Sequence, residues 1–143
     1  MKTILKAALI GFAMSAGTLS TVSLSYAADP VAAATTTSGS FEKTSFSING
    51  DWAIVNENGQ RILRFSDDFK TKNGPDLKLF LSPKSVGDVT GKTATQGAVK
   101  LSVLRSNKGS QDYVIPADID LSKYGSILIH CEAYSKLWGG ANL

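Results

Sequence analysis

Apolar and polar residues alternate along much of this chain in short segments. The clearest case is the segment 76–82, in which every second residue is a leucine. Alternation also places Val99, Leu101 and Val103 on one face of a second segment, and Tyr113 and Ile115 on one face of a third. A period of two is typical of β-strands that bury one face. Pro116 follows the third segment and is expected to end its strand, because proline has no amide hydrogen for a sheet ladder.

Turn signals separate these segments. Asn58-Gly59 lies between two alternating segments, and this dipeptide is the strongest short signal for a β-hairpin. Related signals recur at Asn49-Gly50, Asn73-Gly74-Pro75 and Asn107-Lys108-Gly109. Only residues 118–124 suit a turn or two of helix, with Asp118 or Asp120 as its cap. The sequence therefore predicts an all-β fold with negligible helix, an antiparallel β-sandwich of about eight short strands.

The beginning of the chain has the pattern of an export signal. Lys2 and Lys6 precede an apolar stretch, and Ser25-Tyr26-Ala27 offers small residues where a signal peptidase cleaves. A retained membrane anchor is the alternative, but serine, threonine and glycine dilute the apolar stretch. No cysteine lies near the cleavage point, which excludes a lipoprotein anchor. We expect residues 1–27 to be removed, leaving a secreted or periplasmic protein without a membrane span.

The remaining chain divides into a linker and one domain. Residues 28–40 contain no large apolar side chains and are predicted to be a flexible linker. Residues 41–143 are enough for one buried core. Loss of Lys2 and Lys6 with the signal lowers the formal net charge from +3 to +1. A nearly neutral chain with scattered charges gives no reason to expect nucleic-acid binding.

Composition removes several kinds of chemistry. The chain has one histidine and one cysteine, too few for a blue-copper site, a tetrahedral zinc site or an iron–sulfur cluster. It has no C-x-x-C redox pair and no covalent haem motif. The stretch 87–93 is one residue short of a phosphate-binding loop, and His130 has no nucleophile elbow nearby. A haem bound through a single thiolate stays possible.

Cys131 lies in the apolar segment 126–134. Alternation places Ile127, Ile129 and Cys131 on an inward face and His130 on the opposite, partly exposed face. In an oxidising compartment an unpaired thiol is buried in a core, joined to another molecule, or used chemically. The residues by themselves favour a small buried side chain over a redox group, because free cysteine is commonly buried.

Three ordered motifs and the C-terminal segment resemble the DM13 electron-transfer domain family. They are Gly74-Pro75-Asp76-Leu77, Gly109 to Pro116, Tyr124-Gly125-Ser126-Ile127 leading to Cys131, and Leu137 to Leu143. The resemblance implies an extracellular or periplasmic domain, often found beside DOMON cytochrome-like domains. It also implies that Cys131 is the family's hallmark cysteine, acting in electron transfer as a bare thiol or through a group such as haem. One departure is His130, which stands where the family usually has an aromatic residue.

We therefore expect a small exported redox or electron-transfer module centred on Cys131, with His130 as a secondary site residue. Such a module would need an electron-transfer partner in trans and would not be a stand-alone enzyme. Bare thiol chemistry is favoured over haem, because the predicted loop 83–97 has few large apolar residues to enclose a porphyrin. His130 or Lys136 would supply a cation beside a thiolate. The alternative is a non-catalytic binding or adhesion module, a common use of β-sandwiches.

Overall fold

The hairpin predicted at Asn58-Gly59 is the centre of the first sheet. The computed structural model describes residues 37–143, and there strands β4 (Asp51–Glu57) and β5 (Gln60–Phe65) pair across this turn. Asn58 and Gly59 have φ of 51° and 75°, the positive values that a tight two-residue turn requires. Strands β1 (Thr37–Ser40) and β9 (Gln111–Ile115) complete the order β1-β4-β5-β9.

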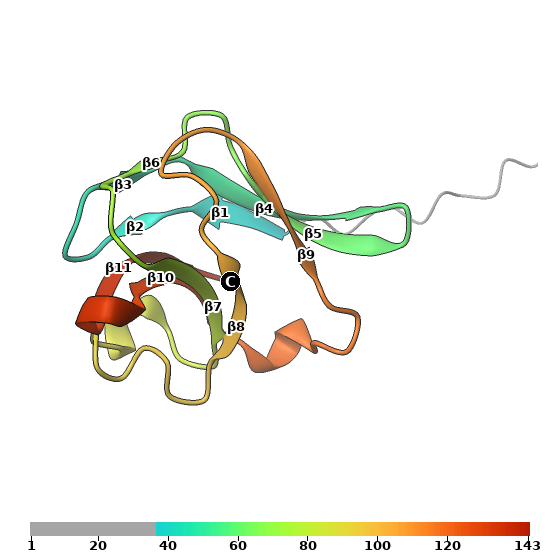
Figure 1. Ribbon diagram of the computed structural model, residues 1–143. Coiled ribbons are helices and arrows are strands. Elements are labelled where there is room, and N and C mark those ends of the chain that lie inside the picture. The colour runs from blue at the N-terminus through green and yellow to red at the C-terminus, as the bar shows by residue number, and fades with distance from the viewer. Residues whose placement is uncertain (1–36) are drawn as a thin grey trace, which may run out of the picture. The chain divides into compact units, whose positions relative to one another are not determined.

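The second sheet faces the first (Figure 1). Its strands are, in spatial order, β2 (Glu42–Lys43), β11 (Lys136–Asn142), β10 (Ser126–Cys131), β7 (Leu77–Ser82) and β8 (Val99–Val103). All the pairings between these strands are antiparallel. A short ribbon of β3 (Ile48–Asn49) and β6 (Lys70–Thr71) lies beside them.

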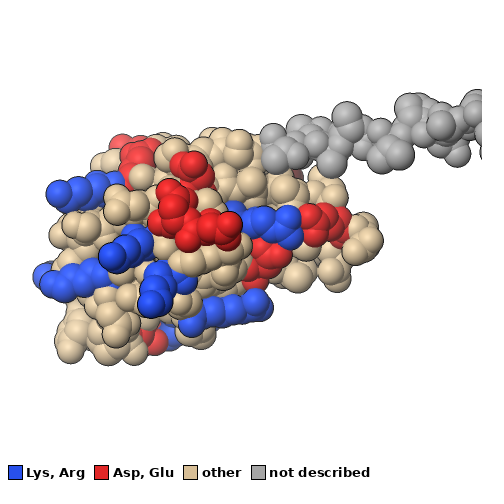
Figure 2. Space-filling model, turned by 90° about the horizontal axis from the view of Figure 1, so that it is seen from above, with Lys and Arg blue, Asp and Glu red and all other residues tan. Residues whose placement is uncertain are grey.

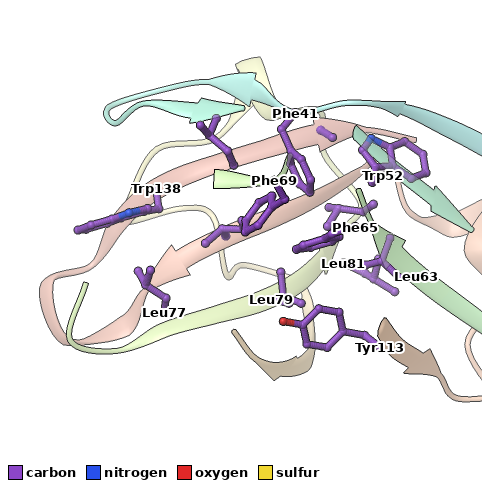
Figure 3. Close-up of a cluster of buried hydrophobic side chains, with 14 of the residues drawn as sticks. Phe41, Trp52, Leu63, Phe65, Phe69, Leu77, Leu79, Leu81, Tyr113 and Trp138 are labelled. Carbon is purple, nitrogen blue, oxygen red and sulfur yellow. The ribbon is translucent and has the colours of Figure 1, made fainter. Parts of the chain in front are cut away.

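The inner faces of the two sheets share one core (Figure 3). Alternation places Leu79 and Leu81 of β7 in this core, as the sequence predicts, opposite Phe65 and Tyr113 of the first sheet. Phe41, Phe65 and Phe69 pack against one another with ring centroids 4.7–5.2 Å apart. Burial of these apolar side chains is the main force that holds the sheets together.

The predicted fold class is confirmed. Eight of the strands have four or more residues, and the described part of the chain contains no α-helix, only three short 3-10 turns. These are η1 (Val86–Asp88), η2 (Leu121–Lys123) and η3 (Glu132–Tyr134). The turn η2 falls where a helical turn was predicted, and Asp120 caps it by accepting a hydrogen bond from the Ser122 amide. Among residues 37–143 no helix has the length and apolar character needed to cross a membrane.

Two expectations about strands were wrong. Residues 37–40 belong to β1 and pair with β4, so the domain begins within the predicted linker. Gly39 is opposite Trp52 in this pairing, and a Cβ there would make a tight contact, 3.1 Å from the Trp52 ring. Val99 and Val103 are 37% and 58% exposed, because β8 is an edge strand whose register with β7 shifts between Leu79 and Phe80. The rest of the predicted linker and the predicted signal lie outside the described residues.

The predicted long connection 83–97 covers the outer face of the second sheet. Its Val86, Val89 and Ala94 form a second apolar cluster with three residues of the sheet: Phe80, Leu128 and Leu137. Strand β10 is therefore buried on both of its faces, and all its residues are buried. This second layer decides the surroundings of both candidate site residues.

An ion-pair network on the first sheet generates a prediction about pH. The Arg64 guanidinium lies 2.8 Å from Glu57 and 2.7 Å from Asp112, and its hydrogen bonds lower the pKa of the Asp112 carboxyl. Because the pKa of Asp112 is lower in the folded than in the unfolded state, its ion pair stabilises the fold above about pH 4. This stabilisation is lost as the pH falls through the folded-state pKa. We expect Asp112→Asn to lower the unfolding midpoint at pH 7, with a difference that shrinks in acid.

Urea unfolding of both proteins from pH 2 to pH 7 would test this. Asp118→Asn is the matched control, because Asp118 is an exposed carboxylate on a loop. A difference between Asp112→Asn and the wild type that stays constant with pH would contradict the prediction.

Candidate functional site

Cys131 is the last residue of β10, opposite Leu77 of β7 and Lys136 of β11. Its exposed fraction is 0%, and its thiol is unpaired within the main core. The predicted inward orientation of this side chain is therefore confirmed. Lys136, one of the expected cations, is opposite Cys131 in the register but has an exposed side chain.

His130 was expected to be partly exposed, and this was wrong. Only 3% of the residue is exposed, because the segment around Gly91 covers the outer face of β10. The imidazole Nε2 lies 2.7 Å from the Gly91 carbonyl oxygen, and the ring meets Phe80 edge-on at 5.9 Å. A carbonyl oxygen only accepts hydrogen bonds, so Nε2 is the donor. The other nitrogen, Nδ1, is buried and has no hydrogen-bond partner among the described residues.

Cys131 and His130 point to opposite faces of β10, and the structure does not bring them together. The irregularity that could have rotated one of them lies instead on β11, where Trp138 is the extra residue opposite Ile129 and His130. Strand β10 keeps its alternation, with Cys131 in the main core and His130 beneath the loop. Residues 37–143 contain no group of three or more His, Cys, Asp or Glu side chains arranged to hold a metal ion.

A charged cluster holds the chain just after Cys131. The Lys78 ammonium pairs with Glu132 and lies 3.1 Å from the Asp76 carboxylate, and the Glu132 amide donates to the Asp76 carbonyl oxygen at 3.1 Å. The hydrogen bond to Glu132, and then that to Asp76, raises the pKa of Lys78. Sequence reasoning missed this cluster. Alternation places Lys78 on the outer face of β7, but it does not show that Glu132 is its neighbour.

The family-like motif at Gly74 forms one wall of a cavity close to the cysteine. This cavity, about 320 Å³, is lined by the turn 73–77 and by the segment 103–107. Leu77 lines it and is also the β7 neighbour of Cys131. Gly74 has no room for a side chain, since a Cβ would lie 2.8 Å from Leu77 and 3.0 Å from Trp138. The motif therefore fixes close packing over the end of β7 that lies beside Cys131.

The motif around Gln111 and Tyr113 has a structural role. The Tyr113 hydroxyl accepts from the Arg105 amide at 3.0 Å and donates to Gln111 Oε1 at 2.6 Å. Gln111 also accepts from the Ser106 amide and donates to the Ser106 carbonyl. Burial raises the pKa of Tyr113. These bonds satisfy backbone groups in the connection between β8 and β9, as buried polar groups require.

A haem does not fit the surroundings of the cysteine. An iron ligand needs open space at its donor atom, whereas Cys131 is fully buried among packed core residues. His130 Nε2 is already bonded to Gly91. The cavity of about 320 Å³ beside Leu77 is lined by neither Cys131 nor His130. The described residues thus suit a bare thiol better than a thiolate-bound porphyrin.

Comparison with known proteins gives one match. A family model described as "Electron transfer DM13" matches residues 40–143. Searches of the curated proteins and of the solved structures each found no match. The matched region begins at the end of β1 and includes Cys131, His130 and the motif at Gly74.

Two glycines of the covering loop allow a matched test of how tightly it packs. A Cβ at Gly91 would lie 2.1 Å from the Ser135 carbonyl oxygen, whereas a Cβ at Gly87 would meet nothing within 4 Å. We expect Gly91→Ala to destabilise the domain by about 1–3 kcal/mol, because two backbones must separate. Gly87→Ala should change stability by less than about 1 kcal/mol. Equal midpoints for the two variants in urea unfolding would show that the loop does not press on residues 135–136.

Substitution of the cysteine tests its burial. Cys131→Ser should cost on the order of 1–3 kcal/mol, because a hydroxyl without a partner replaces a thiol in an apolar site. Cys131→Ala should cost less than Cys131→Ser, because it leaves a small void but no unsatisfied polar group. Denaturant unfolding under reducing conditions measures both. A serine variant as stable as the wild type would mean that the site is open to water.

Proposed function

Since this chain belongs to the DM13 electron-transfer family, we propose that it is an exported redox module whose redox group is the Cys131 thiol. The observation that carries this proposal is the family match across residues 40–143, together with the presence of a single cysteine in the whole chain. Secretion or transport to the periplasm is part of the proposal, and it is supported by the sequence pattern of residues 1–27. The electron-transfer partner acts in trans.

The chemistry that fits a lone thiol is exchange with a disulfide of the partner protein. The deprotonated Cys131 sulfur attacks one sulfur of that disulfide, and its proton passes to solvent. A bond forms between Cys131 and the attacked sulfur, the partner's own S–S bond breaks, and the second partner sulfur leaves as a thiolate. Cys131 is oxidised and the leaving sulfur is reduced. A thiolate of a third molecule then attacks the Cys131 sulfur and releases the partner as a dithiol, and a second such thiolate attacks the sulfur now bound to Cys131. This last step frees Cys131 as a thiolate and leaves the two donor sulfurs joined as a disulfide, so that two electrons pass from the donor thiols to the partner.

Burial means that this thiol reacts only after a local opening. Cys131 is the last residue of β10 and is followed at once by the surface turn η3. Ser135 ends this turn with a φ of 49°, a conformation that a non-glycine residue rarely adopts. Separation of the Lys78–Glu132 pair would release the turn and leave Lys136 beside the emerging sulfur. Opening of a strand end requires less free energy than unfolding of the whole domain.

A second function is favoured by one observation. Complete burial of the only thiol suits a non-catalytic binding module, in which Cys131 is simply part of the core. The two functions differ in how the thiol becomes accessible. A redox module needs a local opening, whereas a core cysteine needs none.

The discriminating measurement is the rate of mixed-disulfide formation with oxidised glutathione. We expect this rate, followed by mass spectrometry, to exceed the global unfolding rate at the same pH and temperature by roughly tenfold or more. Lys78→Met should raise the rate further, because it releases the turn after Cys131. Cys131→Ala is the negative control. A rate equal to that of global unfolding would sink the redox proposal and favour the binding module.

A further inference from the structure

Charges are distributed unevenly over the domain. Seen from above, basic side chains gather at the side where Figure 1 places β3 and β6, and acidic ones gather closer to the β4–β5 hairpin (Figure 2). Four exposed basic residues belong to β6, to the residue that follows it and to the β8–β9 connection; they are Lys70, Lys72, Arg105 and Lys108. We name these four residues the basic end surface.

Backbone pairing forces two of these charges together. Lys70 and Lys108 are opposite each other in a β-bridge, held by a 2.8 Å hydrogen bond from the Thr71 amide to the Asn107 carbonyl. Like charges directly opposite each other across strands are destabilising. None of the four residues forms an ion pair with another residue of 37–143. Lys70 and Lys108 are thus opposite each other without an ion-pair partner in the described part of the chain, and an anionic partner would relieve their repulsion.

Lys72 is held in place more firmly than a typical surface lysine. Its ammonium lies 5.6 Å from the centroid of the Phe46 ring, and Phe46 stacks on Trp138 with centroids 3.8 Å apart. The Trp138 indole donates to the Lys72 carbonyl oxygen at 2.8 Å. A side chain that is ordered before binding loses less entropy when a partner arrives.

The basic end surface contains a hollow in which acidic side chains could bind. A shallow cavity of about 410 Å³ is lined by Lys70 and Lys72 together with Ser47, Asn49 and Thr71. Ammonium groups at the edge of such a hollow, with a hydroxyl and an amide beside them, suit carboxylates. Lysine acts there as a point charge and does not require a planar ligand.

Two residues of the basic end surface, Arg105 and Lys72, adjoin residues that pack near the end of β10. Arg105 lines the cavity of about 320 Å³ together with Leu77, which is the β7 neighbour of Cys131. The Trp138 indole is hydrogen-bonded to the Lys72 carbonyl oxygen. Trp138 and Leu77 both lie next to Gly74. Figure 3 shows Trp138 and Leu77 at the same end of the core. A partner on this surface would therefore stand close to the strand end that must open.

We propose that the basic end surface is the docking site for an acidic face of the redox partner protein. This inference rests on the proposed function and names the chemistry of the partner. Complementary charge accelerates the encounter of two proteins and orients it, and weak electron-transfer complexes bury small interfaces. A few aspartate and glutamate side chains over Lys70, Lys72, Arg105 and Lys108 would supply that complementarity.

The test uses a fluorescein-labelled decaglutamate peptide as the probe, with the purified protein at low ionic strength and anisotropy as the readout. The triple variant Lys70→Glu, Lys72→Glu and Lys108→Glu should raise the Kd for the peptide roughly tenfold. The matched control, Lys84→Glu, Lys92→Glu and Lys100→Glu, changes the net charge equally on other exposed lysines. Its Kd should change by no more than about twofold.

Equal weakening in the two variants, or no binding of the peptide to the wild type, would overturn the proposal. Heparin oligosaccharides and phosphatidylglycerol vesicles are the competing probes. If either binds more tightly than the peptide and loses binding in the basic-end variant, the surface serves a polyanion or a membrane rather than a protein. Cys131→Ala should bind the peptide like the wild type. Failure of docking is thus separable from failure of thiol exchange.

Discussion

Burial of β10 on both faces is the constraint on which the rest of this structure depends. The inner face packs Ile127 and Ile129 against the first sheet, and the outer face packs Leu128 against the loop 83–97. Each of these side chains is fully buried, and full burial of one aliphatic side chain is worth about 1.5–3 kcal/mol. The strand is thus the centre of a three-layered arrangement, in which the loop acts as a third layer.

This arrangement separates the two residues with reactive side chains. Cys131 belongs to the main core, whereas His130 lies beneath the loop and bonds to Gly91. The two side chains lie on opposite faces of the same strand. In this arrangement they cannot form a Cys–His nucleophile or bind one metal ion together. Any reactivity of the thiol therefore depends on movement at the end of β10, where the chain turns through η3 and the Lys78–Glu132 pair restrains it.

The polar chemistry of the molecule lies outside that apolar centre and has two forms. One consists of hydroxyl and amide groups that hydrogen-bond to each other or to the backbone, as at Tyr113 and Gln111. The other consists of lysines brought together by backbone pairing, with no ion-pair partner among the described residues, as at Lys70 and Lys108. The first form stabilises the fold. The second opposes stability, and this is the reason for inferring a role in binding.

Much of the fold could be predicted from local pattern. Alternation identified the inward leucines of β7, the Asn58-Gly59 turn identified the first hairpin, and the apolar face of residues 127–131 identified the inward thiol. These features depend on residues adjacent in sequence, whose side chains must alternate across a strand. The uninterrupted run Ile127-Leu128-Ile129 was a sign of burial on both faces that alternation alone obscured.

Only the tertiary structure decided what covers each face. His130 is buried because Gly91 and the valines near it fold back over β10, and Lys70 is opposite Lys108 because β6 meets the β8–β9 connection. In both cases the partners are some forty residues apart in sequence. No periodicity within a segment specifies which distant segment will lie on it. That choice follows from how the two sheets and their loops bury the largest apolar area together.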